Sequence, residues 1–370
     1  MVEGLRVDPS SAPTPAASPT PPRPTSQNTV ELRGVTHRFG ENLALNDLSF
    51  VVPDQQITVL LGPNGAGKTT AIRAITGALA PHEGTVRTFG CDPSEEGDLV
   101  RPRCGVVSAK PALYDRLSGY DNLLYSAQLY DVPKARIAER IDAVATRFGI
   151  GAALSAQVGG FSTGMKTRLA LARSVLHEPD LLLFDEPTSG LDPESSLAVL
   201  DLIREMTSEG CTVVMCTHLL AEAEGLADHI VIMEAGTDLT AGSADTLTAE
   251  YWPGNLLVLD AETPDQLDRV ANWQGVVAYD RVDVANVYLD GFGRVPEIVA
   301  SLAADGVRLT RVEPRQPTLE DLYFTIRRQS KGAGLSPVSA TGQMLGSLAG
   351  AERSATQPRL ANQRAEVTTR

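Results

Sequence analysis

Short apolar runs alternate with amphipathic stretches through most of the chain, as in proteins built on a parallel sheet covered by helices. The apolar runs predict buried strands at 57–61, 181–184, 212–216 and 230–233. Amphipathic spacing predicts helices at 68–79, 112–130 and 134–150. Strands that alternate with helices indicate an α/β sheet, here with a helical insertion.

Composition divides the chain further. Residues 1–28 are rich in Pro, Ser and Thr, and residues 331–370 are small and polar, so we expect both to be disordered. The pattern between them predicts an α/β domain at 29–247, with a helical subdomain at about 112–177. After a break at YWPGN, strand-like and amphipathic runs predict a small α+β accessory domain at 248–330.

Net charge, hydropathy and cysteine content limit the classes of protein to which the chain can belong. A net charge of −14 over 370 residues disfavours a broad nucleic-acid surface. No stretch approaches the roughly 18 apolar residues of a membrane span, and the N-terminus lacks a signal pattern, so we expect a cytosolic chain. The cysteines have no metal-like spacing and are interpreted as reduced thiols: Cys91, Cys104, Cys211 and Cys216.

The segment VLLGPNGAGKTTAI at 59–72 has the spacing of a phosphate-binding loop between a strand and a helix. Its glycines let backbone N–H groups turn toward an anion, Lys68 can reach the β- and γ-phosphates, and the Thr69 hydroxyl can coordinate Mg²⁺. The predicted ligand is a nucleoside triphosphate. The residues of this loop predicted to bind the nucleotide are Gly62, Pro63, Asn64, Gly65, Ala66, Gly67, Lys68, Thr69 and Thr70.

Two acids and a histidine follow later strands. Asp185 and Glu186 come at the carboxyl end of an apolar strand, where ligands bind in parallel sheets. Asp185 is a candidate Mg²⁺ ligand, directly or through water, and Glu186 a candidate for polarising the attacking water. His218 follows TVVMCT and is a candidate γ-phosphate contact. Taken singly, the acids also fit helix caps and the histidine a structural role.

The segment FSTGMKTRLALARSVLHEP at 161–179 places Ser162, Thr163 and Gly164 at a helix start. A serine side chain and free N–H groups there can receive an anion. In isolation the pattern indicates only a helix cap.

In this order GPNGAGKTT, FSTGMKTRLALA, LLLFDEPTSGLD and CTH resemble the nucleotide-binding subunit of an ABC transporter, over about residues 29–245. The resemblance implies the P-loop NTPase cassette fold: a mixed-sheet RecA-like core, an antiparallel β subdomain and a helical subdomain. It also implies that two cassettes pair head to tail around ATP and Mg²⁺. ATP would then contact the signature of the opposite protomer, which is Ser162, Thr163, Gly164 and Met165.

The same resemblance places Asp192 at the dimer interface and Phe39 against the adenine, although a buried structural role is the alternative for Phe39. The C-terminal part, including VEPRQPTLEDLYFTI at 312–326, resembles the subgroup that serves ABC-2-type exporters, among them drug-resistance systems. This implies an ATPase coupled to export of drug-like or other hydrophobic compounds. It would act at the cytoplasmic face of the cell membrane as a peripheral protein.

The implied partners are an integral membrane permease and a second cassette subunit, most simply in a homodimer, with no nucleic acid. The permease is expected to dock near the loop at 103–118 and the segment 112–133. Candidate anchors are Tyr114, Tyr120, Leu123 and Tyr125, and packing inside the helical lobe is the alternative for each.

One position departs from the family. Ala109 stands where these proteins carry a glutamine that touches Mg²⁺ and the attacking water, and a methyl group can do neither. Lys110 or a water could fill the gap, or the loop could align in a different register. Hydrolysis could also be slow, or the subunit could be a low-turnover regulator. Thr163 and Met165 also replace the commoner Gly and Gln. A soluble cassette ATPase without a transporter is the other alternative, disfavoured by a single cassette and no coiled-coil repeat.

Overall fold

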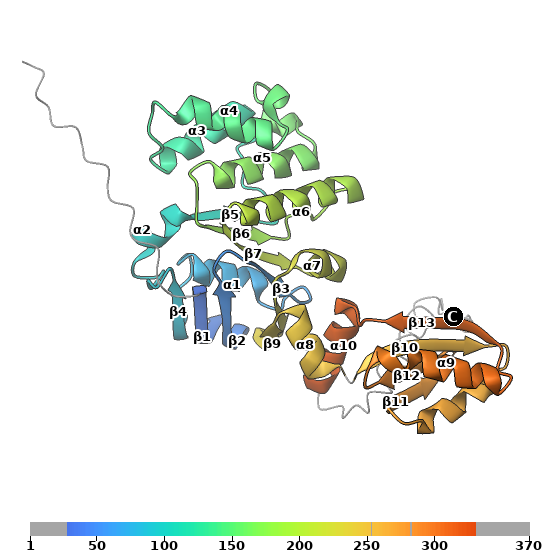
Figure 1. The fold of residues 1–370 in the computed structure, drawn as a ribbon. Coiled ribbons are helices and arrows are strands. Elements are labelled where there is room, and N and C mark those ends of the chain that lie inside the picture. Colours follow the sequence, from blue (N-terminus) through green and yellow to red (C-terminus); the bar gives the residue numbers. More distant parts are fainter. Residues whose placement is uncertain (1–27, 253, 282, 331–370) are drawn as a thin grey trace, which may run out of the picture.

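The computed structural model describes residues 28–252, 254–281 and 283–330. The disorder expected at 1–28 and 331–370 therefore lies outside the described residues, apart from Asn28, which begins a strand. Figure 1 shows a larger body of sheets and helices and a smaller appendage, with α8 (Ala244–Tyr251) and α10 (Leu319–Ser330) between them. In the described part of the chain, no helix combines the length and the apolar character needed to cross a membrane.

The larger body is centred on a six-stranded sheet in the order β5-β6-β7-β3-β8-β9. Its strands are parallel except β9, which runs antiparallel to β8. Every residue of β3, β6 and β7 is buried, as expected for a parallel sheet with both faces covered. The strands in chain order are β3 Ile57–Leu61, β5 Cys104–Val107, β6 Leu181–Asp185, β7 Thr212–Thr217, β8 His229–Glu234 and β9 Thr237–Gly242. The four predicted strands are present, each within one residue at either end.

A second sheet packs on the first through helix α1. Strands β1 (Asn28–Phe39), β2 (Asn42–Pro53) and β4 (Glu83–Thr88) form an antiparallel sheet in the order β2-β1-β4. Helix α1 (Lys68–Ile75) shares one hydrophobic core with this sheet and with strands of the central sheet. The β1–β2 hairpin therefore reaches the edge of the central sheet where α1 begins.

Three helices form the helical subdomain at the top of Figure 1: α3 (Gly119–Leu129), α4 (Ile137–Arg147) and α5 (Thr163–Val175). The helix predicted from residue 112 begins only at Gly119. Ser118 caps it, accepting from the N–H of Asp121 at 3.0 Å, while the Asp121 carboxylate accepts the N–H of Ser118 at 3.4 Å. Residues 112–118 form a loop, so the prediction was wrong there.

The other predicted helix, at 68–79, also ends early. Helix α1 stops at Ile75, and Gly77 adopts a φ of +70°. A glycine in this left-handed region is a common helix terminator. The remaining helices of this body are α2 (Gly97–Val100), α6 (Pro193–Ser208) and α7 (Leu220–Leu226).

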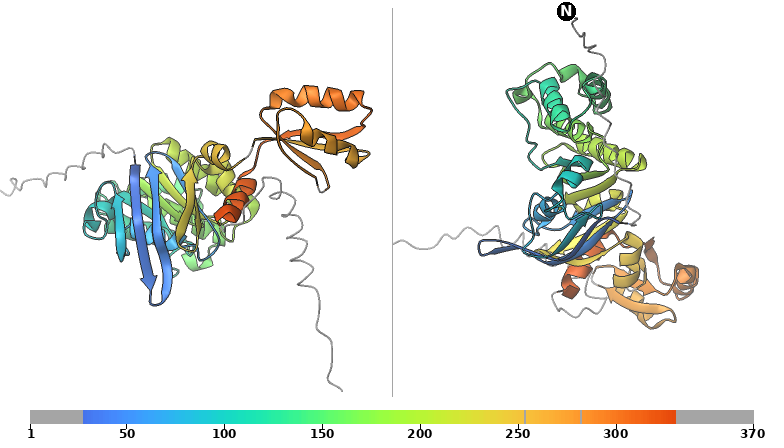
Figure 2. Two further views of the ribbon diagram at one scale, coloured as in Figure 1. Left: turned by 90° about the horizontal axis from the view of Figure 1, so that it is seen from below. Right: turned by 90° about the vertical axis from the view of Figure 1, so that its left-hand side faces the viewer.

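The appendage is an antiparallel sheet in the order β11-β12-β10-β13. Helix α9 (Val295–Ala304) and the 3₁₀ segment Pro264–Asn272 share with one face of this sheet a core that includes Leu257, Val287 and Leu302. The strands are β10 Asn255–Ala261, β11 Val276–Arg281, β12 Ala285–Leu289 and β13 Leu309–Arg315. Helix α8 (Ala244–Tyr251) leads into the appendage, and α10 (Leu319–Ser330) returns from it to the larger body, as the left view of Figure 2 shows.

Helix α10 is held by polar contacts at both ends. The N–H of Leu319 donates to Oε1 of Glu224 on α7 at 3.1 Å. The Arg327 guanidinium donates to both carboxylate oxygens of Glu234, at 2.8 and 2.7 Å. These hydrogen bonds to Glu234 raise the pKa of Arg327. The last helix therefore bonds to two elements of the larger body, α7 and the end of β8.

The Arg327–Glu234 pair provides a test of this attachment. We expect Arg327→Met to lower the free energy of unfolding by about 1–3 kcal/mol, because it removes two charge-assisted hydrogen bonds to a mostly buried carboxylate. The change is measured by thermal unfolding and by hydrogen exchange of α10. Arg308→Met is the matched control, since Arg308 pairs with Glu262 on the exposed surface. Equal losses in the two variants would contradict a special role of Arg327.

Candidate functional site

One pocket, with a volume of 380 Å³, gathers most of the predicted site residues. It lies at the carboxyl ends of β3 and β6, beside the start of α1. Of the predicted residues, it is lined by Phe39, Asn64, Gly65, Ala66, Gly67, Lys68, Thr69, Thr70, Ala109, Asp185 and Glu186. Sequence reasoning missed Asn42, Leu43 and Ala44, which also line it. Asn42 pairs with Phe39 across the β1–β2 hairpin. A prediction of that pairing would therefore have placed residues 42–44 near the pocket.

The Gly-rich loop is held between two strands, which explains its glycines. Gly67 has a φ of +98°, and a Cβ there would lie 2.7 Å from the carbonyl oxygen of Ala44 on β2. A Cβ at Gly62 would lie 2.3 Å from the carbonyl oxygen of Met233 on β8. The loop is further fixed by the N–H of Gly236, which donates to the Ala66 carbonyl at 3.1 Å. Side chains at either glycine would therefore push the loop out of place.

Lys68 carries its ammonium group inside this loop. The side chain is 6 % exposed, and Nζ donates to the carbonyl of Gly62 at 2.7 Å and to that of Pro63 at 3.2 Å. The nitrogen also lies 3.8 Å from Oε1 of Glu186. A buried, preoriented cation at a helix start is suited to phosphate oxygens. Gly62 and Pro63 thus contribute through their carbonyls, although they do not line the pocket.

Thr69 and Asp185 both line the pocket and contact each other. The Thr69 hydroxyl donates to Oδ2 of Asp185 at 2.8 Å. Burial raises the pKa of Asp185; the Thr69 hydrogen bond opposes this effect, and the nearby negative charge of Glu186 adds to it. A bound cation would stabilise the charged carboxylate at this position. These two hard oxygen donors fit Mg²⁺, which usually takes only one or two protein ligands beside phosphate and water.

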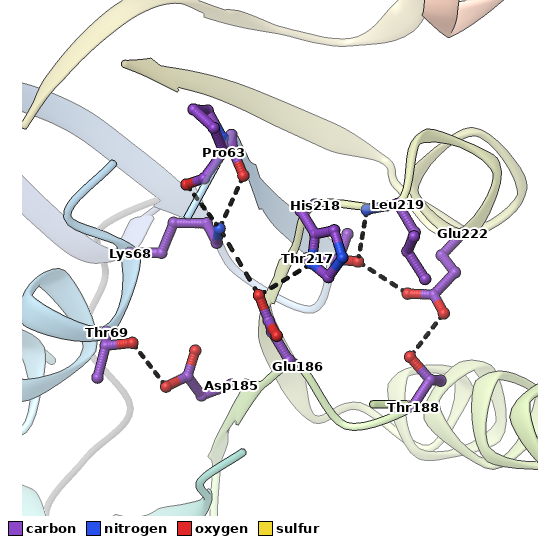
Figure 3. A network of polar contacts seen from close by, with 11 residues as sticks. Pro63, Lys68, Thr69, Asp185, Glu186, Thr188, Thr217, His218, Leu219 and Glu222 are labelled. Atoms are coloured by element: carbon purple, nitrogen blue, oxygen red, sulfur yellow. Dashed lines mark hydrogen bonds and ion pairs between the residues drawn. The ribbon is translucent and has the colours of Figure 1, made fainter. Parts of the chain in front are cut away.

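Glu186 lies between a lysine and a histidine (Figure 3). Oε1 of Glu186 is 3.0 Å from Nδ1 of His218, which is 42 % exposed. Glu186 has a φ of +51°, in the left-handed region that non-glycine residues rarely adopt, and its N–H donates to the Cys216 carbonyl at 2.9 Å. Strained backbone of this kind is concentrated at functional positions. The structure thus brings together the acid and the histidine that the sequence placed 32 residues apart.

Phe39 and Ala109 line the same pocket. In the sequence, Phe39 comes before the glycine-rich loop and Ala109 comes after it. Phe39 ends β1 and lines the pocket, and the residue is 45 % exposed. Its ring packs edge-on against His37, with 4.7 Å between the ring centroids. Ala109 lines the pocket and presents no polar side-chain atom. Lys110 is exposed and is not among the residues that line the pocket. The geometry therefore gives no support to Lys110 as a substitute for the missing glutamine.

The signature residues lie elsewhere. Ser162 caps α5 and accepts the N–H of Met165 at 3.2 Å, and both Ser162 and Thr163 are exposed. Asp192 caps α6, accepting the N–H of Ser195 at 2.9 Å. A Cβ at Gly190 would lie 3.8 Å from Cγ2 of Thr163, so the segment that leads to Asp192 neighbours the signature. Neither Ser162–Met165 nor Asp192 lines the pocket of its own chain.

Comparisons with known proteins agree with this geometry. Residues 45–189 match the ABC transporter family. The chain is 34 % identical over 298 residues to the daunorubicin resistance ATP-binding protein DrrA3 of Streptomyces coeruleorubidus, covering 80 % of this chain and 94 % of the relative. It is 32 % identical over 301 residues to the Nod factor export ATP-binding protein I of Rhizobium sp. (strain N33), covering 81 % and 97 %.

Among solved structures, an ATP-binding subunit of an ABC transporter is similar with a TM-score of 0.56 and 29 % identity, over 60 % of this chain and 93 % of that one. The cbiO1 subunit of Clostridium perfringens is similar with a TM-score of 0.55 and 26 % identity, over 61 % and 92 %. The predicted cassette fold is confirmed. The chain belongs to the ATP-binding subunits of ABC transporters, the ATPases that power transport.

Proposed function

We propose that this chain is the ATP-hydrolysing subunit of an ABC-2-type exporter. The observation that carries the proposal is the single pocket in which Lys68, Glu186 and the Thr69–Asp185 pair converge. Export is supported by relatives named for daunorubicin resistance and Nod factor export. Both names point to organic cargo, so we propose drug-like or other hydrophobic compounds as the substrate class. The subunit would act at the cytoplasmic face of the cell membrane.

Phosphoryl transfer to water depends on positioning and on neutralisation of charge more than on covalent chemistry. Lys68 would bind the β- and γ-phosphates, and the glycine loop would present backbone N–H groups to them. Thr69 and Asp185 would hold Mg²⁺, which supplies further positive charge at the phosphates when bound. Phe39, exposed at the edge of the pocket, would stack on the adenine.

Glu186 is the proposed acceptor of the proton from the attacking water. Its carboxylate is kept between the Lys68 ammonium and the His218 ring, so its oxygen has a defined position beside the lysine proposed to bind the γ-phosphate. His218 would orient Glu186 and contact the γ-phosphate. The balance is simple: the water oxygen forms the new P–O bond, the bridging oxygen leaves with ADP, and the proton passes to the Glu186 carboxylate.

A second copy would complete the site. Exposed Ser162 and Thr163 stand beside the segment carrying Asp192, and this surface is separate from the chain's own pocket. A helix start with free N–H groups suits the γ-phosphate of ATP bound by the partner. Two copies that close only around ATP would convert the presence of the nucleotide into motion.

A groove on the helical subdomain is the proposed docking site of the permease. It has a volume of 180 Å³, and among its lining residues are Tyr114, Tyr125 and Leu129, all exposed. The Tyr114 and Tyr125 rings meet edge-on at 5.3 Å. Tyr120 is exposed as well, but Leu123 is fully buried in the helical core, so it is wrong as a surface anchor. Exposed aromatic rings of this kind are typical anchors for a protein partner.

A low-turnover regulatory subunit is the second candidate function. The observation that favours it is Ala109, which lines the pocket at the position where the family carries a glutamine. Retention of Lys68, Asp185, Glu186 and His218 in one constellation favours a working site over this alternative.

Substitution of the proposed base tests the chemistry. We expect Glu186→Gln to lower kcat by about 10²- to 10⁴-fold, because the amide cannot accept the proton. ATP binding should persist, so that a dimer accumulates in the presence of ATP. Phosphate release and light scattering measure the two effects. Glu250→Gln, an exposed glutamate on α8, is the control. Unchanged turnover would remove Glu186 from this role.

Restoration of the missing glutamine tests the role of Ala109. We expect Ala109→Gln to raise kcat at saturating ATP by roughly 2- to 10-fold, since one well-placed hydrogen bond contributes about 0.5–1.5 kcal/mol. Ala112→Gln places the same side chain in the same loop outside the ATP pocket and should leave kcat of the isolated subunit unchanged. If the two variants have the same turnover, Ala109 does not determine the rate.

The partner is tested by purifying the tagged chain from detergent-solubilised membranes of its native cell. We expect a polytopic membrane protein at stoichiometric yield, and loss of it in Tyr114→Ser/Tyr125→Ser. Val277→Ser, which removes an exposed apolar side chain from the appendage, should retain it. Recovery of the wild-type chain only from the soluble fraction would overturn the transporter proposal.

A further inference from the structure

A buried carboxylate lies behind the proposed catalytic pair. Glu222 is in the first turn of α7, four residues after His218, and is 9 % exposed. Among the described residues, no Lys, Arg or His forms an ion pair with it. A carboxylate without a cationic partner costs free energy to bury unless hydrogen bonds satisfy its oxygens. The buried Glu222 carboxylate therefore needs hydrogen-bond donors for its two oxygens.

Two threonine hydroxyls satisfy this carboxylate (Figure 3). Thr188 donates to Oε1 at 2.6 Å, and Thr217 donates to Oε2 at 2.8 Å. Both threonines are buried, at 5 % and 2 % exposure. An ionised carboxylate only accepts hydrogen bonds, so it orients both hydroxyl protons toward itself.

The Thr217 hydroxyl also bonds to the backbone next to His218. With its proton directed to Glu222, the Thr217 oxygen accepts the N–H of Leu219 at 3.0 Å. Residues 217 and 219 flank His218, so the two bonds fix the peptide on both sides of the histidine. The His218 ring is otherwise 42 % exposed and depends on its backbone for placement.

On the other side, the bond from Thr188 to Glu222 restrains the segment that follows Glu186. The segment folds back in a tight turn, in which the N–H of Ser189 donates to the Glu186 carbonyl at 3.1 Å. This turn follows the left-handed backbone of Glu186, at a φ of +51°. Anchoring Thr188 therefore helps to hold a strained residue in place.

We propose that Glu222 is a positioning residue for ATP hydrolysis. One carboxylate clamps the segment after Glu186 and the segment before His218, and so sets the 3.0 Å contact between their side chains. Glu222 does not line the ATP pocket and acts through the pair. The inference rests on the proposed roles of Glu186 and His218, and it extends them to a residue outside every motif in the sequence.

The test is Glu222→Gln in the full chain, which keeps the shape but supplies only one accepting oxygen. The amide N–H₂ then faces one threonine, whose hydroxyl has to reverse. We expect kcat to fall roughly 10- to 100-fold, as for a small misplacement of reacting groups. The KM for ATP should change by less than about twofold, because the phosphate contacts proposed for Lys68 and the glycine loop remain. Glu250→Gln is the matched control and should leave both constants unchanged.

Threonine variants separate positioning from a merely structural role. Thr188→Val deletes one hydrogen bond and Thr217→Val deletes two, and both should lower kcat. Thr217→Ser and Thr188→Ser keep the hydroxyl and should keep the wild-type kcat. In a His218→Ala background, Glu222→Gln should have little further effect, since the pair is already broken. A fall in melting temperature with unchanged kcat, or independent effects of the two substitutions, would overturn the proposal.

The outcomes also separate this inference from the proposed function. If Glu186→Gln and His218→Ala leave kcat unchanged, the proposed catalytic roles fail. If both variants lose activity while Glu222→Gln and the threonine-to-valine variants keep wild-type kcat, the positioning role alone fails. Should Glu222→Gln not fold, the threonine pairs give the same comparison, because each changes a single hydroxyl.

Discussion

The site depends on the parallel register of three neighbouring strands. In this sheet β3 lies beside β7 and β7 beside β6, with Leu61 opposite Thr217 and Cys216 opposite Asp185. The register places the carboxyl ends of the three strands at one edge, so the glycine loop, the two acids and the histidine begin side by side. The backbone continues the pairing beyond the strands: the Gly62 N–H donates to the Thr217 carbonyl, and that of Glu186 to the Cys216 carbonyl. A one-residue shift of any strand would separate these groups.

The charged side chains of the pocket suit a ligand that carries both negative and positive charge. Lys68 is buried and offers one positive charge, while Asp185 and Glu186 offer two negative charges within the same pocket. Burial raises the pKa of Asp185, and the neighbouring negative charge of Glu186 adds to this effect, so a bound cation would favour the charged carboxylate. A nucleotide with its divalent cation adds charges of both signs, so Lys68 would gain phosphate oxygens and Asp185 a cation in addition to their contacts within the fold.

The sequence predicted the groups whose identity is set by local chemistry. The loop from Gly62 to Thr70, the acids after β6 and the histidine after β7 each combine a strand signal with a required residue type. Predictions failed where tertiary packing decides. Leu123 lies on an amphipathic helix whose sequence does not reveal which face is covered, and it is fully buried. The helix expected from residue 112 begins instead at the capping box of Ser118 and Asp121. The hydrophobic pattern does not show that the residues before this capping box form a loop.

Glu222 was missed for a different reason, which also concerns the appendage. Its partners, Thr188 and Thr217, come from two other segments, and only the fold brings them together. The helix that carries Glu222 also carries Glu224, which accepts the N–H of Leu319 on α10. At its other end, α10 grips Glu234, next to the turn whose Gly236 donates to the Ala66 carbonyl of the glycine loop. Helix α10 therefore bonds both to the helix that carries Glu222 and to the end of β8, beside the turn that contacts the glycine loop. The appendage is thus attached to the cassette through the same elements that position its phosphate loop and its histidine.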